Sequence, residues 1–186
     1  MDGIACNQYS FVAVHVYCSL GQDQLERIFH HSPLDILFSD KSEIEKVSEY
    51  AQNVPLIVSL DSLGELMGRL HTRFPQSRFF SLKEFEKSGR GEIFDPVPPS
   101  PDTLATICYT SGTERSPKGV MLTHANLIAN AAGCDVSGIL KLNDSDVHLS
   151  FLPLAHMFEQ LMCLLMSTRG GQIGFCRDVR YSMHSH

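Results

Sequence analysis

The chain has 186 residues, which is long enough for one domain with a buried core. Its hydrophobic fraction of 43% and charged fraction of 19% are typical of a globular protein in water. The net charge is -6, and no basic block or stripe is present, which argues against nucleic acid as a partner. The apolar run Leu161–Met166 is far shorter than the roughly 20 residues of a membrane-spanning helix.

The cysteines and histidines do not form a recognisable metal site. None of the six cysteines forms a Cys-x-x-Cys pair, and most of them lie in apolar runs. We therefore expect buried, reduced thiols, as in a cytosolic protein. The nine histidines also lack the spacing of metal ligands, so no metal site is expected in this chain.

Strands and helices are predicted to alternate from the N-terminus onward. Residues Tyr9–Tyr17 are apolar on both faces of an extended chain, which predicts a strand buried on both sides, with His15 as a core or edge residue. A short helix follows and ends at Pro33. The next predicted strand is Leu34–Phe38.

Three Ser-x-x-Glu patterns predict helix starts, because the two side chains can cap the first backbone N–H groups of a helix. They lie at Ser42–Glu45, Ser62–Glu65 and Ser81–Glu84, and the apolar strand Val54–Leu60 separates the first two. This alternation predicts an α/β fold, with a mostly parallel sheet and helices on both of its faces.

The elements of the second half follow a linker at residues 88–102, which its prolines hold extended. A strand is predicted at Thr103–Tyr109, then a polar loop, then a helix that Thr123 caps and Gly133 ends. A further strand, an apolar helix, a turn at residues 170–171 and a last strand complete the pattern. The chain is thereby divided into βα units at 1–87, the linker, a second group of units at 103–176 and a tail at 177–186.

The polar loop lies within ICYTSGTERSPKGVMLTH, residues Ile107–His124, and has the composition of an anion-binding loop. Backbone N–H groups in such loops and at helix N-termini favour anions. Gly112 allows a phosphate to approach the backbone, Lys118 supplies a positive charge, and three hydroxyls can donate hydrogen bonds: Thr110, Ser111 and Thr113. It is not a Walker loop, because Pro117 and Gly119 stand where glycine and Ser/Thr are required.

This stretch resembles the phosphate loop of the adenylate-forming enzymes, whose pattern is Tyr-Thr-Ser-Gly-Thr-Thr-Gly-x-Pro-Lys-Gly. FLPLAHMFEQ, residues Phe151–Gln160, is similar to a second signature of the long-chain fatty acyl-CoA synthetase branch, at the right spacing. The resemblance covers nearly the whole chain and implies part of the large N-terminal domain of such an enzyme. The competing interpretation is a generic α/β domain with an incidental Ser/Gly turn.

The resemblance implies ATP-dependent activation of a long-chain fatty acid. The carboxylate attacks the α-phosphate of ATP to give an acyl-adenylate and pyrophosphate, and coenzyme A then displaces AMP. Lys118 and His156 are the implied catalytic residues, and His156 is expected to shape substrate entry near the acyl group and not to act as a base. The implied ATP-binding residues are Thr110, Ser111, Gly112, Thr113, Glu114, Arg115, Lys118 and Gly119.

The sequence also leads to expectations about the role of Glu159, about the substrates and cofactors, and about the location in the cell. Glu159 is either a site residue or a structural ion-pair partner, and its position in the first turn of a helix favours the structural role. Fatty acid, ATP with Mg2+, and coenzyme A are the implied partners, although the family's magnesium ligands are not found in this chain. A cytoplasmic location is expected, including by resemblance the cytosolic face of the endoplasmic reticulum or of the mitochondrial outer membrane.

Two features depart from the family pattern. Glu114 stands at a threonine position and Arg115 at a glycine position. A carboxylate about 4 Å from a phosphate charge is repelled by about 4 kcal/mol at an effective dielectric constant of about 20. We therefore expect weakened ATP binding unless Glu114 pairs with Arg115 or points to solvent.

The second departure is length, because family members carry magnesium, ribose and C-terminal catalytic segments that are not found before His186. Together, the two departures support an alternative function, a truncated, non-catalytic binding or regulatory form of the enzyme.

Overall fold

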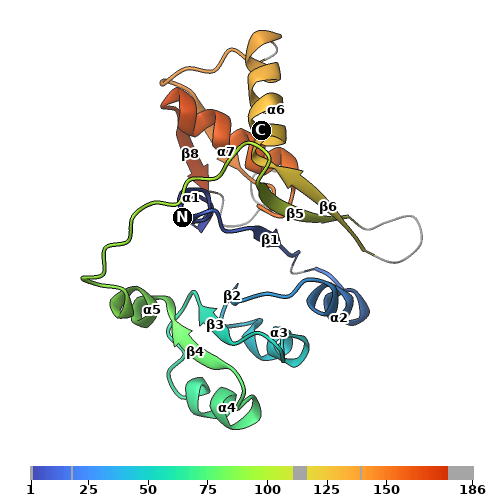
Figure 1. Cartoon of the computed structure of the whole chain (residues 1–186), viewed down its shortest axis with the longest axis vertical. Coiled ribbons are helices and arrows are strands. Elements are labelled where there is room, and N and C mark those ends of the chain that lie inside the picture. The colour runs from blue at the N-terminus through green and yellow to red at the C-terminus, as the bar shows by residue number, and fades with distance from the viewer. Residues whose placement is uncertain (1, 18, 111–116, 139, 176–186) are drawn as a thin grey trace, which may run out of the picture. The chain divides into compact units, whose positions relative to one another are not determined.

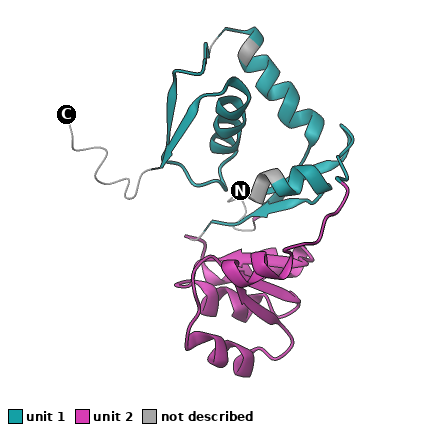
Figure 2. Cartoon of the chain, turned by 90° about the vertical axis from the view of Figure 1, so that its left-hand side faces the viewer, with its two compact units in different colours: residues 1–17, 96–111, 118–186 teal, residues 18–95, 112–117 magenta. Residues whose placement is uncertain are grey.

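The computed structural model of the chain describes residues 2–17, 19–110, 117–138 and 140–175. Figure 2 colours its two compact units separately. Unit 1 comprises residues 2–17, 96–110, 118–138 and 140–175, and unit 2 comprises residues 19–95 together with Pro117.

Unit 2 is a run of alternating helices and strands (Figure 1). Its three strands form a parallel sheet in the order β2-β3-β4. The central strand β3 carries Ile57 and Val58, and both side chains are completely buried. In chain order the elements are α2 Gln22–His31, β2 Ile36–Ser39, α3 Ile44–Tyr50, β3 Leu56–Ser59, α4 Leu66–Arg73, β4 Arg78–Ser81 and α5 Leu82–Ser88.

Unit 1 contains two sheets. One has the strand order β1-β5-β6, with β5 parallel to β1 and antiparallel to β6, and the other is the parallel pair β7-β8. Helix α7 connects β7 to β8 and contacts both strands and α6. The elements are α1 Asp2–Tyr9, β1 Ala13–His15, β5 Leu104–Thr110, β6 Lys118–Thr123, α6 His124–Val136, β7 Val147–Ser150, α7 Met157–Arg169 and β8 Gln172–Phe175.

The predicted α/β class with mostly parallel strands is confirmed, since four of the five strand pairings in the described residues are parallel. The strands form three sheets and not one. Because β1 pairs with β5, residues 2–17 belong to the same unit as the segment after the linker. The predicted boundaries at 87/88 and 102/103 stay predictions about domain organisation.

Two strands were not predicted. Strand β4 has only four residues, and its last residue, Ser81, is also the N-cap of α5. The helix-start pattern at Ser81 was recognised, but the short strand before it was not. Strand β6 pairs with β5 over the stretch that was interpreted as the end of the loop and the approach to a helix. Its apolar side chains are largely exposed, Met121 to 69%, so it lacks the buried alternation from which strands are recognised.

The predicted strand at Tyr9–Tyr17 is wrong over most of its length. Helix α1 ends at Tyr9, and β1 contains only Ala13–His15, the three residues that pair with β5. Between them, Ser10 adopts a positive φ of 57°, which bends the chain, and its hydroxyl donates to the carbonyl of Val97 at 2.6 Å. Phe11 is 60% exposed, so the segment is not buried on both faces.

Of the three predicted capping boxes, only the one at Ser81 is confirmed. The Ser81 hydroxyl accepts from the Glu84 N–H at 3.4 Å, and the Glu84 carboxylate accepts from the Ser81 N–H at 2.9 Å. The Ser81 hydroxyl also donates to the Glu84 carboxylate at 2.6 Å, and this bond, together with the one from the Ser81 N–H, lowers the pKa of Glu84. The boxes at Ser42 and Ser62 are wrong, because α3 and α4 begin only at Ile44 and Leu66, after turns, and have no side-chain cap.

The remaining helix ends were predicted with mixed success. The Thr123 hydroxyl accepts from the Asn126 N–H at 3.3 Å, which confirms Thr123 as a cap. Gly133 does not end α6, because the helix continues to Val136 and the positive φ occurs at Gly138. Gly170 ends α7 with a φ of 73°, as expected for a turn after a helix.

Replacing Ser81 by alanine should lower the free energy of unfolding by about 1 kcal/mol, because the first turn of α5 loses its cap. Chemical denaturation followed by circular dichroism measures this change. Ser62→Ala is the matched control and should change stability much less, since α4 has no side-chain cap. Equal losses in the two variants would contradict the assignment of the cap.

Candidate functional site

The β5–β6 hairpin holds the two ends of the predicted phosphate loop together. In its antiparallel ladder, Thr110 at the end of β5 is the register partner of Lys118 at the start of β6. The strands lie side by side in Figure 1. Predicted site residues Ser111, Gly112, Thr113, Glu114 and Arg115 lie outside the described residues.

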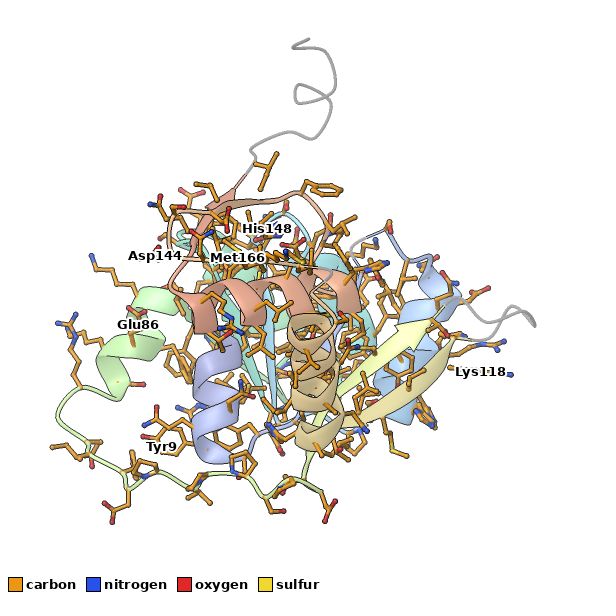
Figure 3. All side chains as sticks on the ribbon, turned by 90° about the horizontal axis from the view of Figure 1, so that it is seen from above. Tyr9, Glu86, Lys118, Asp144, His148 and Met166 are labelled. Carbon is orange, nitrogen blue, oxygen red and sulfur yellow. The ribbon has the colours of Figure 1, made fainter. Side chains whose placement is uncertain are left out.

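Lys118 is available to an anion. Its side chain is exposed and points away from the ribbon at the start of β6 (Figure 3). Among the residues that the structure describes, Lys118 has no ion-pair partner. Thr110 is also exposed, so a hydroxyl and an ammonium group flank the mouth of the hairpin. This pair suits a phosphate, because both groups can donate hydrogen bonds to its oxygens.

Gly119 is explained by packing within the hairpin. It pairs with Tyr109 across the ladder. A Cβ atom at this position would lie 3.0 Å from Cγ2 of Ile107 and 3.3 Å from the Tyr109 ring. Any larger residue would therefore push these side chains aside, next to Lys118. A contact of Gly119 with ATP stays a prediction.

His156 lies at the start of α7, as its N-cap. Its Nδ1 accepts a hydrogen bond from the Phe158 N–H at 3.2 Å. Nδ1 is therefore unprotonated and the proton of the neutral ring is on Nε2. The imidazole is exposed. It makes no hydrogen bond to Lys118 in the described part of the chain.

Contacts of the first turn of α7 bring it against β5, two residues before Thr110. The Cys108 thiol lies 3.0 Å from the Met157 sulfur. Nε2 of Gln160 donates to the Leu154 carbonyl at 2.7 Å and lies 3.3 Å from Nδ1 of His15. The helix that carries His156 is thus joined to the strand that ends at the hairpin mouth.

The polar contacts that join His15 to Gln160 and to Thr106 were not predicted from the sequence. His15 was expected only as a core or edge residue, and Gln160 was not singled out. Nδ1 of His15 also lies 3.4 Å from the Thr106 hydroxyl, which donates to the Ala13 carbonyl at 2.9 Å. A polar residue within the predicted apolar strand was the available signal, but its partner is 145 positions away in the chain.

Glu159 has the structural role that its position favoured. It is completely buried, and its Oε1 lies 3.0 Å from Nε2 of His148 on β7. Burial raises the pKa of Glu159, but the Ser150 hydroxyl and His148 together outweigh that effect and lower the pKa. Burial and the nearby Glu159 charge raise the pKa of Cys163, so this thiol is poorly suited to be a nucleophile.

Within the described residues, no group of three or more His, Cys, Asp or Glu side chains could hold a metal ion. Two cavities, of about 530 and 360 Å³, lie in unit 2, and neither is lined by a predicted site residue. No described helix is both long and apolar enough to span a bilayer.

The sequence comparison decides the family. The sequence profile described as "AMP-binding enzyme" matches residues 4–185. The chain belongs to the AMP-binding enzyme family. The resemblance to the adenylate-forming enzymes that the sequence motifs predicted is therefore confirmed. The relatives that the chain resembles are long-chain fatty acyl-CoA synthetases.

Curated relatives in this family are long-chain ligases. The chain is 38% identical over 188 residues to a long-chain-fatty-acid–CoA ligase of Cavia porcellus, covering 96% of this chain and 27% of that protein. It is 36% identical to fatty acyl-CoA synthetase A of Dictyostelium discoideum, covering 94% of this chain and 26% of that protein. The chain therefore spans about a quarter of the length of these relatives.

Solved structures support the AMP-binding fold. The adenylation domain of a carboxylate reductase from Mycobacterium chelonae superposes with a TM-score of 0.77 at 22% identity, covering 92% of this chain and 28% of that one. An adenylation and carrier didomain from Segniliparus rugosus, solved with AMP, gives 0.76 at 20% identity, covering 97% of this chain and 28% of that one. At these identities the likeness shows the fold alone.

Replacing Glu159 by alanine should lower the free energy of unfolding by about 3 kcal/mol, because it removes one partner of a buried pair. Urea denaturation at neutral pH measures the loss. Glu86→Ala, which removes an exposed glutamate from α5, is the control and should have little effect. A loss no larger than that of Glu86→Ala would contradict the buried pair.

The same carboxylate predicts a pH dependence. Since folding lowers the pKa of Glu159 from 4.5, its stabilising effect is present above that value and is lost as the pH falls through the lower pKa of the folded chain. The stability difference between the unmodified chain and Glu159→Gln should therefore shrink below pH 4.5. Urea titrations across this range measure it, and a difference that stays constant would refute the prediction.

Proposed function

We propose that the chain carries the phosphate-binding hairpin and the acyl-site helix for ATP-dependent, AMP-forming activation of a long-chain fatty acid to acyl-CoA. The observation that carries the proposal is the register pairing of Thr110 with Lys118, at the mouth of a loop that resembles the family's phosphate-loop pattern. The family match and the long-chain relatives support the substrate class.

The roles within the hairpin follow from its chemistry. The exposed ammonium of Lys118 would neutralise phosphate charge, and the Thr110 hydroxyl would donate a hydrogen bond beside it. From the family's phosphate-loop pattern we propose that further residues also contact ATP: Ser111, Gly112, Thr113, Glu114, Arg115 and Gly119. His156, with its proton on Nε2, would present a neutral donor at the acyl end of the site.

ATP is proposed from the residues of the hairpin, whereas Mg2+ and coenzyme A are proposed only from the family. ATP fits the donors at the hairpin mouth, since phosphate oxygens only accept hydrogen bonds. Mg2+ and coenzyme A are proposed from the family alone, and we assign no residue of the described chain to either. Association with the cytosolic face of the endoplasmic reticulum or of the mitochondrial outer membrane likewise remains a prediction.

A second candidate function rests on the loop sequence. Glu114 places an acceptor-only anion where the family pattern has a hydroxyl donor. This departure favours a non-catalytic binding or regulatory protein that retains the fold. Formation of labelled acyl-CoA from a labelled long-chain fatty acid, ATP and coenzyme A distinguishes the two, since only the ligase produces the thioester.

Lys118→Met should weaken binding of Mg-ATP by about 10- to 100-fold, because it removes a hydrogen bond to a charged group worth about 1.5–3 kcal/mol. Isothermal titration calorimetry measures the affinity. Lys141→Met is the matched control, since Lys141 is an exposed lysine of the same unit outside the hairpin. Equal affinities of the two variants would contradict the proposed phosphate site.

The double variant Glu114→Thr, Arg115→Gly should bind Mg-ATP more tightly than the unmodified chain, because it restores the family pattern and removes the carboxylate. The same titration tests it, with Lys118→Met added to each background. Unchanged affinity would refute the proposed impairment. Absence of binding in both backgrounds would refute a phosphate site formed by this chain.

A further inference from the structure

The chain contains three Ser-Pro dipeptides, at residues 32–33, 100–101 and 116–117. Protein kinases that require proline after the acceptor residue would accept any of them on sequence alone. The structure describes two of the acceptor serines, Ser32 and Ser100, and these differ in their surroundings.

Ser32 is inaccessible in the folded chain. It is only 5% exposed and ends helix α2, where its N–H donates to the Ile28 carbonyl at 2.9 Å. A kinase could reach its hydroxyl only after part of unit 2 had unfolded.

Ser100 lies in a segment shaped like a kinase substrate. Residues 92–100 contain neither helix nor strand, and all but Pro99 are exposed. The prolines of the segment fix φ near the value of an extended polyproline conformation, so little conformational entropy is lost when an enzyme binds it. The prolines are Pro96, Pro98, Pro99 and Pro101.

The Ser100 hydroxyl is held by an exposed turn and not by packing. Its Oγ lies 2.9 Å from the Thr103 hydroxyl, and the Ser100 N–H donates to the same hydroxyl at 3.0 Å. The Thr103 N–H donates to the Ser100 carbonyl at 3.0 Å. Because the hydroxyl pair is exposed, water can replace it at small cost when the side chain turns outward.

The same turn lies against the N-terminus of α6. The Ala125 N–H donates to the Pro101 carbonyl at 2.8 Å, and the His124 N–H donates to the Thr103 carbonyl at 3.0 Å. The positive end of this 13-residue helix favours a dianion on the turn, although Asp102 opposes it.

We propose that Ser100 is a phosphorylation site for a proline-directed protein kinase. The Ser100 Oγ attacks the γ-phosphorus of ATP, an O–P bond forms, and the bond to the β,γ-bridging oxygen breaks. ADP leaves, and the hydroxyl proton passes to the base of the kinase. The modification puts a dianion four residues before the start of β5, the strand whose other end carries Thr110. The proposal does not rest on the proposed function.

Treatment of the folded chain with a purified mitogen-activated protein kinase and labelled ATP tests the site. The chain carries Ser116→Ala, so that only two Ser-Pro dipeptides remain, and mass spectrometry locates the phosphate. We expect about one phosphate per chain at Ser100 and at least tenfold less at Ser32. Ser100→Ala and Pro101→Ala should each abolish the label at this site.

Synthetic peptides of residues 27–37 and 95–105 separate sequence preference from folding. Both should be phosphorylated at similar rates, and only the second site should keep its rate in the folded chain. A folded-chain rate at Ser100 below a tenth of its peptide's rate, labelling of Ser32 equal to that of Ser100, or an inert 95–105 peptide would each overturn the proposal. Lys118→Met should be labelled like the unmodified chain, which keeps this test separate from that of ATP binding.

Discussion

Backbone pairing of β5 with two neighbours is the constraint on which the candidate site depends. Strand β5 is the central strand between β1 and β6, and its residues Ala105, Thr106, Cys108 and Tyr109 are buried. The antiparallel ladder to β6 then sets Thr110 opposite Lys118. Since ladder hydrogen bonds are made by backbone groups, the separation of these two residues does not depend on the side chains of the loop that joins them.

Helix α7 is tied to its surroundings by polar contacts on different sides of its first turn. Glu159 reaches His148 on β7, whereas Gln160 reaches His15 on β1 and the carbonyl of Leu154. Two side chains adjacent in sequence point about 100° apart on a helix, so together they fix its rotation as well as its position. His156, at the N-cap, is thereby oriented by residues that need not touch a substrate.

Short-range sequence patterns predicted some helix ends correctly and others wrongly, whereas contacts between residues far apart in the chain were not predicted. The cap at Ser81 and the turn at Gly170 depend on residues within a few positions, and both were predicted correctly. Strand β6 was missed because its exposed apolar residues have no buried face, so only its pairing with β5 identifies it. Lys118 and Thr110 were predicted as site residues from the loop motif, but the junction of His15 with Gln160 was not, because no local pattern connects residues 145 positions apart.

The departures in the loop therefore concern charge placement more than architecture. Lys118 and Arg115 are basic and Glu114 is acidic, so the formal charge of these three residues equals that of a loop with threonine, glycine and lysine. A difference in net charge therefore cannot change the phosphate affinity relative to the family pattern. Any change must come from where the charged side chains lie and how far they are from the phosphate. At about 4 Å a misplaced carboxylate costs several kcal/mol at an effective dielectric constant of about 20, and the cost falls in inverse proportion to separation. A few ångströms of displacement of one side chain, on a hairpin whose ends are fixed by the ladder, would decide between a working phosphate site and a retained fold without one.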